Sequence, residues 1–146
     1  MNNEQKKQTA VPGVFKLIAC LVYEGLTVIA LGFVCVGLFL WVAGDATHGV
    51  KRFLLQLFLW FAVGAYFTRC WLKTGQTLAM QAWRLKIVNQ RAELLTLNAA
   101  VARYLLASAS LVLFGLGFLW ALVDSDKLFL HDRLLKNKII ILPNQK

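Results

Sequence analysis

Charge is scarce in this chain of 146 residues. Asp, Glu, Lys and Arg together make up 16% of it, whereas about 25% is usual in soluble globular domains. Hydrophobic residues make up 59%, above the roughly 45–50% of such domains. Intrinsic disorder, collagen and coiled coils each need a polar or strictly repeated sequence, so this composition excludes them. It predicts instead a small protein that crosses a membrane more than once.

Acidic residues are especially few. Seven Asp and Glu stand against sixteen Lys and Arg, which gives a net charge of +9. On a soluble domain, clustered basic residues would suggest nucleic-acid binding. Here the basic residues fall mainly between long apolar runs, where they would meet phospholipid headgroups. We therefore predict contact with membrane lipids and no nucleic-acid partner.

Motifs for catalysis or metal binding are also lacking. Cys20, Cys35 and Cys70 have no C-x-x-C spacing, which argues against a zinc site or a redox pair and favours small buried hydrophobes. The sequence contains neither G-x-S-x-G nor H-E-x-x-H. His131 and Asp132 are adjacent, and neighbours on one chain cannot supply a full metal shell. We predict no enzymatic activity, no bound metal and no cofactor.

Two long apolar runs predict two membrane spans. After a polar tail at 1–13, residues 14–43 form the first, and Glu24 is its only charged residue from position 17 onward. A helix of this length can cross about 30 Å of hydrocarbon with tilt, and it is far longer than the apolar region of a cleaved signal peptide. Residues 53–72 form the second span, and Arg69 near its end can extend to the headgroups.

A third apolar run covers residues 104–123 and is interrupted by Gly115 and Gly117. Five basic residues lie in 73–103 and five after 123, against two in the 44–52 turn. Because basic segments favour the cytoplasm, we predict cytoplasmic segments at 73–102 and 124–146 and a cytoplasmic N-terminus. The third run would then bend at the glycines and return. A straight third span with an external C-terminus stays the alternative.

The polar segments predict a small β patch on the cytoplasmic side. Residues 83–87 alternate apolar and basic at period two, which is typical of a half-buried strand. Residues 94–97 and the β-branched 138–142 predict a second and a third strand. Between them and the second span, Gly75, Gln76 and Thr77 lack the phosphate-loop pattern. They predict a tight turn, with Thr77 as the N-cap of a short interfacial helix.

Four blocks of sequence resemble the RDD family of small bacterial membrane proteins, named for an arginine and two aspartates in and around their spans. The blocks are LVYEG at 21–25, GQTLAM at 75–80 with WRL at 83–85, RYLL at 103–106 and LHDRL at 130–134. The resemblance implies one multi-pass domain over 14–146 in the bacterial inner membrane. It also implies a link to transport, which in some members is sodium–proton exchange.

The resemblance assigns family positions to particular residues. Lys16 stands where the first arginine of the family is expected, and Glu24 where its first aspartate is expected. Asp124 is the best match for the later acidic position, with Asp126 as the alternative. The remaining family-motif residues are Gly75, Gln76, Thr77, His131 and Asp132.

Glu24 is the most informative single residue. It lies about ten residues into the first span, or roughly 15 Å along a helix, where a carboxylate costs about 2.5–3.5 kcal/mol. One interpretation is a site that binds a proton or a cation. The other is a structural carboxyl, held by a hydroxyl or an arginine on a neighbouring helix.

Three further charged residues are expected near the cytoplasmic end of the spans. Arg69, Arg103 and Asp124 would form a cluster there, in which Asp124 pairs with Arg103 or Arg69; separate interfacial anchors are the alternative. Lys16 would anchor the first helix to headgroups. With the predicted spans, we expect an all-α transmembrane protein that takes part in transport of a small cation or proton through Glu24 and acts as a homo-oligomer. The alternative function is a scaffold whose basic cytoplasmic face binds lipids or a partner protein.

Overall fold

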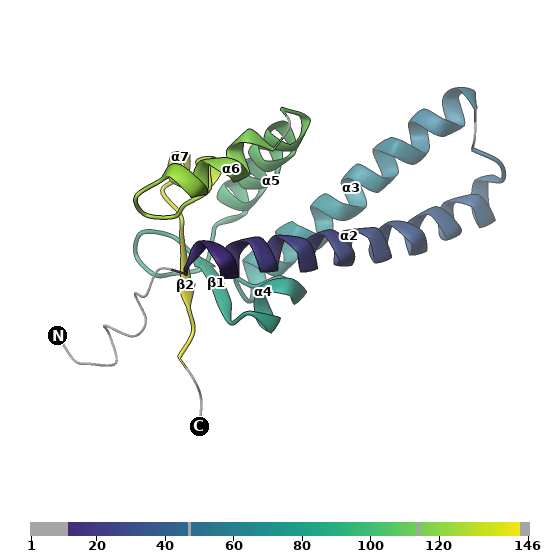
Figure 1. Cartoon of the computed structure of the whole chain (residues 1–146). Coiled ribbons are helices and arrows are strands. Elements are labelled where there is room, and N and C mark those ends of the chain that lie inside the picture. Colours follow the sequence, from purple (N-terminus) through teal and green to yellow (C-terminus); the bar gives the residue numbers. More distant parts are fainter. Residues whose placement is uncertain (1–11, 47, 114, 144–146) are drawn as a thin grey trace.

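The computed structural model describes residues 12–46, 48–113 and 115–143 of the chain, and it is mostly helical (Figure 1). The predicted polar tail at 1–13 lies almost wholly outside the described residues. In chain order the elements are α2 (Val14–Ala43), α3 (Gly49–Lys73), α4 (Leu78–Ala82), β1 (Leu85–Val88), α5 (Leu97–Val112), α6 (Leu116–Val123), α7 (Leu130–Leu134) and β2 (Lys138–Ile141).

Helices α2 and α3 form a long hairpin that extends away from the other elements, with its connecting turn at the far end (Figure 1). They contain 30 and 25 residues, or about 45 and 38 Å at the rise of an α-helix. Both are long and apolar enough to cross a membrane, as predicted. At the turn, Nζ of Lys51 donates to the carbonyl of Ala43 at 2.8 Å and so binds one of the last free carbonyls of α2.

The third apolar segment is bent, as predicted. Helices α5 and α6 meet at an angle of 95°, and Gly115 between them adopts φ 73°, a left-handed conformation that glycine reaches without strain. A Cβ at Gly117 would collide with the side chain of Ser110, so the two helices approach closely at small residues. The segment begins at Leu97 rather than at 104, because the hydroxyl of Thr96 accepts from the Ala99 amide and caps α5.

The two strands pair antiparallel, with Leu85 opposite Ile141 and Val88 opposite Lys138. Strand β1 follows the second span and β2 follows the third segment. Because hydrogen-bonded strands cannot lie on opposite sides of a membrane, the third segment must enter and return on one side. A straight third span is inconsistent with this pairing.

The prediction of a strand at 94–97, the second of three, is wrong. Within the described residues the sheet has only β1 and β2. Leu95 is buried in the core and Thr96 already caps α5, so the chain turns into a helix before it can pair with β1. Short apolar runs of this kind do not distinguish a strand from the approach to a helix.

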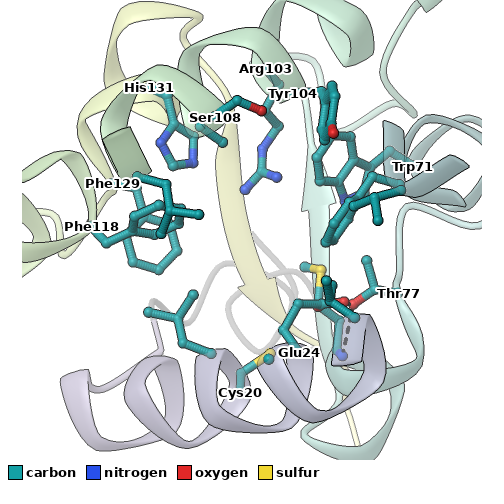
Figure 2. Close-up of a pocket in the computed structure, with 18 of the residues that line it drawn as sticks. Cys20, Glu24, Trp71, Thr77, Arg103, Tyr104, Ser108, Phe118, Phe129 and His131 are labelled. Carbon is teal, nitrogen blue, oxygen red and sulfur yellow. Dashed lines mark hydrogen bonds between the residues drawn. The ribbon is translucent and has the colours of Figure 1, made fainter. Parts of the chain in front are cut away.

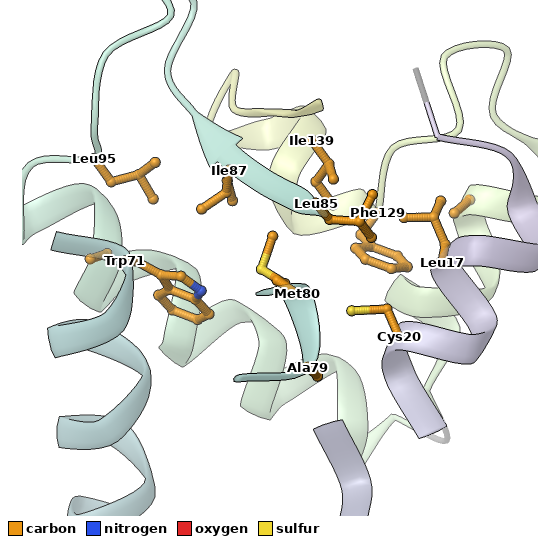
Figure 3. Packing of buried hydrophobic residues seen from close by; sticks show 12 residues of the cluster. Leu17, Cys20, Trp71, Ala79, Met80, Leu85, Ile87, Leu95, Phe129 and Ile139 are labelled. Carbon is orange, nitrogen blue, oxygen red and sulfur yellow. The ribbon is translucent and has the colours of Figure 1, made fainter. Parts of the chain in front are cut away.

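The elements that carry the buried core lie at the end of the molecule opposite the hairpin turn (Figure 1), and Figure 3 shows the core side chains packed together. We call this part the compact end: the first turns of α2, the last turn of α3, α4, both strands, α7 and the adjoining ends of α5 and α6. Its core side chains include Leu17, Cys20, Trp71, Met80, Leu85, Ile87, Phe129 and Ile139. Residues 26–46 and 48–61 form what we call the apolar arm, where large side chains such as Trp41 and Phe33 are exposed by 84% and 77%.

Candidate functional site

A cavity of about 710 Å³ opens where the apolar arm meets the compact end, between α2, α3, α5 and α6 (Figure 2). Its volume lies in the range of pockets that hold small organic molecules. Most of its lining is aliphatic or aromatic, and its polar side chains come from several elements. These side chains are Glu24, Thr77, Arg103, Tyr104, Ser108 and His131.

Glu24 enters the cavity wall from α2. Its Oε2 accepts a hydrogen bond of 2.5 Å from the hydroxyl of Thr77, whereas its Oε1 is buried with no hydrogen-bond partner in residues 12–46, 48–113 and 115–143. The same Thr77 oxygen accepts from the amide of Met80 at 3.2 Å and so caps α4, as predicted. A hydroxyl has one donor and two acceptor positions, so Thr77 can serve both partners at once. The hydroxyl expected as a structural partner of Glu24 is therefore the cap of α4.

Each residue of the Gly75–Thr77 block has a separate structural role. Gly75 adopts φ 70°, and a Cβ there would lie 2.7 Å from the carbonyl oxygen of Ile87, which leaves no room for any other residue. The carbonyl of Gly75 accepts from the Ile87 amide at 2.8 Å. The side-chain amide of Gln76 donates to the carbonyl of Leu85 at 2.6 Å. The block thus ties β1 to α4 and places Thr77 against Glu24.

Arg103 on α5 makes a buried ion pair with Asp132 on α7. Its Nε and Nη2 donate to the two carboxylate oxygens at 2.6 and 2.9 Å, and the residues are 7% and 0% exposed. The guanidinium carbon also lies 4.3 Å from the centre of the Trp71 ring. Such a two-pronged bond fixes the guanidinium in one orientation, so α7 is held against α5 and α3.

His131 precedes Asp132 and is also buried. Its ring stacks on Phe129 with centroids 5.5 Å apart and meets the edge of Phe118 at 5.2 Å. Neither ring nitrogen has a hydrogen-bond partner among the residues that the structure describes, and Nε2 is 3.7 Å from the nearer Asp132 oxygen. Burial lowers the pKa of His131 to about 4; Asp132 acts against this shift and Arg103 adds to it. The ring is therefore neutral at pH 7 and lines the cavity with two unused nitrogens.

Asp124 follows α6 and holds the turn into α7. Its carboxylate accepts from the amides of Asp126 and Leu128 and from the guanidinium of Arg133. Burial raises the pKa of this carboxyl, but the Leu128 amide, the Arg133 charge and the Asp126 amide outweigh it and bring the pKa below its ordinary value. Asp124 is thus a turn-forming ionised group that does not line the cavity.

The predicted pairing of Asp124 with Arg103 or Arg69 is wrong. Arg103 is bound by Asp132 and Asp124 by Arg133. Arg69 is exposed near the end of α3, with no ion pair identified in the part of the chain that the structure describes. Lys16 is exposed at the start of α2, and its contact with headgroups stays a prediction.

Sequence reasoning missed the partner of Arg103 and the links of Glu24 to Thr77 and Arg133 to Asp124. The signal for the first was present: the LHDRL block contains an acidic residue within an apolar and basic surround, far along the chain from Arg103. Among the described residues, no group of three or more His, Cys, Asp or Glu side chains is placed to hold a metal ion. Cys20 and Cys35 are buried and Cys70 is half-buried, all as free thiols.

Comparison with known proteins gives one match. Neither the curated proteins nor the solved structures contain a match to this chain. The family model described as RDD family matches residues 11–136, a range that contains every element of the fold except β2. With its two membrane-length helices, the chain therefore belongs to the RDD family of membrane proteins.

Proposed function

We propose that this protein takes part in the transport of a small cation or a proton, with Glu24 as the group that binds and releases it. One observation carries the proposal: Oε1 of Glu24, a residue of the cavity wall, is buried without a hydrogen-bond partner in the part of the chain that the structure describes. A buried oxygen left without a partner is costly, and a buried carboxylate is favoured by a bound proton or a nearby positive charge. A proton or cation would supply the missing interaction.

The neighbours of Glu24 divide into positioning and electrostatic roles. Thr77 holds one carboxyl oxygen of Glu24, and the other has no hydrogen-bond partner among the described residues. Arg103 lines the same cavity and acts on Glu24 through space. Asp124 and Arg69 do not line the cavity, so the proposed binding site keeps Glu24 and Arg103 and omits these two.

Proton flux into proteoliposomes with an imposed cation gradient tests the proposal. Glu24→Gln keeps an oxygen able to accept from Thr77 but removes the charge, so we expect its flux to fall to that of empty liposomes. Glu93→Gln is the matched control, because Glu93 is exposed in the turn after β1 and does not line the cavity. Equal flux in the wild type and Glu24→Gln would refute the role of Glu24.

The orientation that we propose places the compact end in the cytoplasm of the bacterial inner membrane. The strand pairing puts residues 85–88 and 138–141 on one side, and the basic regions 73–103 and beyond 123 belong to that side, whereas the 44–52 turn with two basic residues lies at the far end. Basic segments favour the cytoplasm. A reporter fused after residue 146 should therefore be active in the cytoplasm, and an external signal would overturn the orientation.

A homo-oligomer is part of the proposal. The two spans and the bent segment leave the cavity partly open, and large apolar side chains on α2 and α3 are exposed in the single chain. Lipid or a second copy must cover them. Cross-linking in native membranes at single cysteines introduced on the apolar arm tests this, and exclusively monomeric product at every position would contradict it.

A non-catalytic scaffold is the second candidate. Basic side chains project from the compact end around the sheet, on the surface that would face the cytoplasm. They are Lys73, Arg84, Arg91, Lys136 and Lys138, which are exposed, and Lys86, which is half-buried. A copurified protein that is lost in Arg84→Ala/Lys86→Ala, with flux absent in the wild type, would favour this function. Neither candidate requires an enzymatic step or a cofactor.

A further inference from the structure

The polar groups of the cavity suit a bare metal ion poorly. Hard cations such as Ca²⁺ or Mg²⁺ take about six or more oxygen ligands, whereas the side-chain oxygens of the lining come only from Glu24, Thr77, Tyr104 and Ser108. Thr77 is already bound to Glu24, and the Tyr104 hydroxyl donates to the carbonyl of Trp60 at 2.7 Å. A cavity of about 710 Å³ would leave such an ion without a coordination shell.

The charge of the lining favours a cation all the same. The Arg103 guanidinium is matched by both oxygens of Asp132, and His131 is uncharged near pH 7 because burial brings its pKa to about 4. Among the described residues no cation lies within ion-pair distance of Glu24. When Glu24 is ionised, the cavity wall with its buried Asp132 therefore carries one net negative charge.

The apolar lining supplies the second requirement, which is a wall for an organic body. Phe67, Trp71 and Tyr104 line one side, where the ring centre of Phe67 lies 5.2 Å from that of Trp71 and 6.2 Å from that of Tyr104. Phe118 and Phe129 form a second group, with centres 5.3 Å apart (Figure 2). Aromatic faces attract ammonium groups and bury alkyl chains.

Unused hydrogen-bonding atoms complete the site. Figure 2 shows the imidazole of His131 and the guanidinium of Arg103 across the cavity from Glu24 and Cys20 on α2. Among the described residues, the Glu24 Oε1 atom and both His131 nitrogens are buried without hydrogen-bond partners, and His131 is 1% exposed. Buried polar groups without partners are costly, so these atoms indicate that a polar ligand belongs there.

From these contacts we propose that the cavity binds a monovalent organic cation, an ammonium group on an apolar body. The ammonium donates to Oε1 of Glu24, and the apolar body lies against the aromatic walls. This inference names the chemical class of solute for the site of the proposed function, and it rests on the same role for Glu24. A lipid acyl chain, an anionic amphiphile and a second copy of the chain are the competing occupants.

A matched series of probes separates these occupants. Decylammonium, 1-decanol and decanoate share one alkyl chain and differ in charge. We would measure equilibrium binding of each, radiolabelled, to the full chain in nanodiscs of zwitterionic lipid at pH 7, after subtracting partition into empty nanodiscs. We expect saturable binding of decylammonium and at least tenfold weaker binding of the other two, since a charged hydrogen bond is worth a factor of this order.

Each other ranking of the probes overturns the proposal in a specific way. Equal binding of decanol and decylammonium would show that the cavity binds acyl chains without regard to charge. Tighter binding of decanoate would show that Arg103 and His131 bind an anion there. If none of the three probes binds saturably, the cavity is covered by a second copy of the chain and the proposal is wrong. Because this series uses the wild type only, it gives a result even if a variant fails to fold.

Two variants then locate the binding. We expect Glu24→Gln to weaken decylammonium binding at least tenfold and Glu93→Gln to leave it unchanged. Ala107→Phe, which places a ring in the cavity lining, should abolish binding of all three probes without loss of helical circular dichroism. Unchanged binding in either cavity variant would place the ligand elsewhere and refute the assignment.

Failure of this inference and failure of the proposed function give different results. Decylammonium binding that depends on Glu24, without any cation or proton flux, would uphold the organic cation and overturn transport. Proton flux that depends on Glu24, without decylammonium binding, would uphold transport and overturn the organic cation.

Discussion

The compact end and the apolar arm share helices α2 and α3, but their polar side chains are bonded in different ways. In the compact end, polar side chains bond to partners far along the sequence: Thr77 to Glu24 across 53 positions and Arg103 to Asp132 across 29. The side chains of the arm bond locally, although the Trp60 carbonyl also accepts from the Tyr104 hydroxyl of α5. Thr27 donates to the carbonyl of Tyr23 four positions away, and Lys51 to that of Ala43 eight positions away.

This difference reflects the solvent of each region. Lipid offers apolar surface everywhere, so an arm residue needs only to be apolar and helical. The side chains of Val34, Trp41 and Phe53 are accordingly exposed. A charge buried in the compact end has no water and must be matched by one particular partner. The specific information of the fold, and its candidate chemistry, is therefore concentrated where the spans enter the compact end.

The largest expected effect follows from breaking the buried ion pair. Asp132→Ala leaves Arg103 charged and buried, so we expect a loss of about 3–5 kcal/mol in the free energy of unfolding, measured by denaturant titration in mixed micelles. The double variant Arg103→Met/Asp132→Leu is the control. Because apolar pairs often replace buried ion pairs at little cost, it should recover most of the loss, and failure to do so would mean that the pair has a role beyond matching charge.

Acid should destabilise the compact end through His131. The unfolded ring takes up a proton near pH 6.5, whereas the folded ring does so only near its pKa of about 4. The unfolded state is therefore increasingly favoured as pH falls from about 6.5 to about 4, by roughly 3 kcal/mol at most, and the loss levels off below that.

The variant His131→Phe isolates this contribution from that of other titrating groups. Its ring can still pack between Phe118 and Phe129 but takes up no proton. The stability difference between wild type and His131→Phe should change between pH 6.5 and 4 and stay constant above pH 7. A difference that is independent of pH would show that the imidazole is not buried as described.

The contrast between the two regions also explains how far the sequence predicts the fold. The spans, the break at Gly115 and the cap at Thr77 were predicted because each has a local signature: an apolar run, a glycine, a side chain that can accept from an amide three positions on. The re-entrant third segment was predicted from the distribution of basic residues, which is a bias of the whole chain. Its structural proof is the pairing of β1 with β2.

Local signatures of this kind do not predict which charged residues pair with each other in the compact end. Asp124 and Asp132 both follow the bent segment, and only the turn after α6 decides that Asp132 meets Arg103 while Asp124 holds Arg133. Glu24 was singled out by its apolar surroundings, and a hydroxyl partner was expected, but nothing local identified that hydroxyl as Thr77. The cavity itself depends on the packing of four helices and has no pattern in the sequence.

A glycine substitution compares the two regions directly. Gly75→Ala adds a Cβ 2.7 Å from the Ile87 carbonyl at φ 70°, so the backbone of the compact end must shift at a cost of about 1–3 kcal/mol. Gly37→Ala in the arm meets nothing within 4 Å and should be neutral or slightly stabilising, because alanine favours helix. Both are measured by thermal unfolding in the same nanodiscs. Equal midpoints for the two variants would contradict the tight contact between Gly75 and β1.

The smallest effect is expected at Arg69, where the two regions join. Its side chain is exposed near the end of α3, and Trp71, two positions later, already receives the guanidinium of Arg103 on its ring. A single exposed charge contributes little to folding, so Arg69→Gln should change the free energy of unfolding by less than about 0.5 kcal/mol. Repeating the measurement in anionic and zwitterionic nanodiscs sharpens the prediction, because an arginine that contacts headgroups should contribute more in the anionic lipid. A loss above about 2 kcal/mol in both lipids would mean that Arg69 has a buried acidic partner, and would extend the charge network of the compact end along α3 toward the apolar arm.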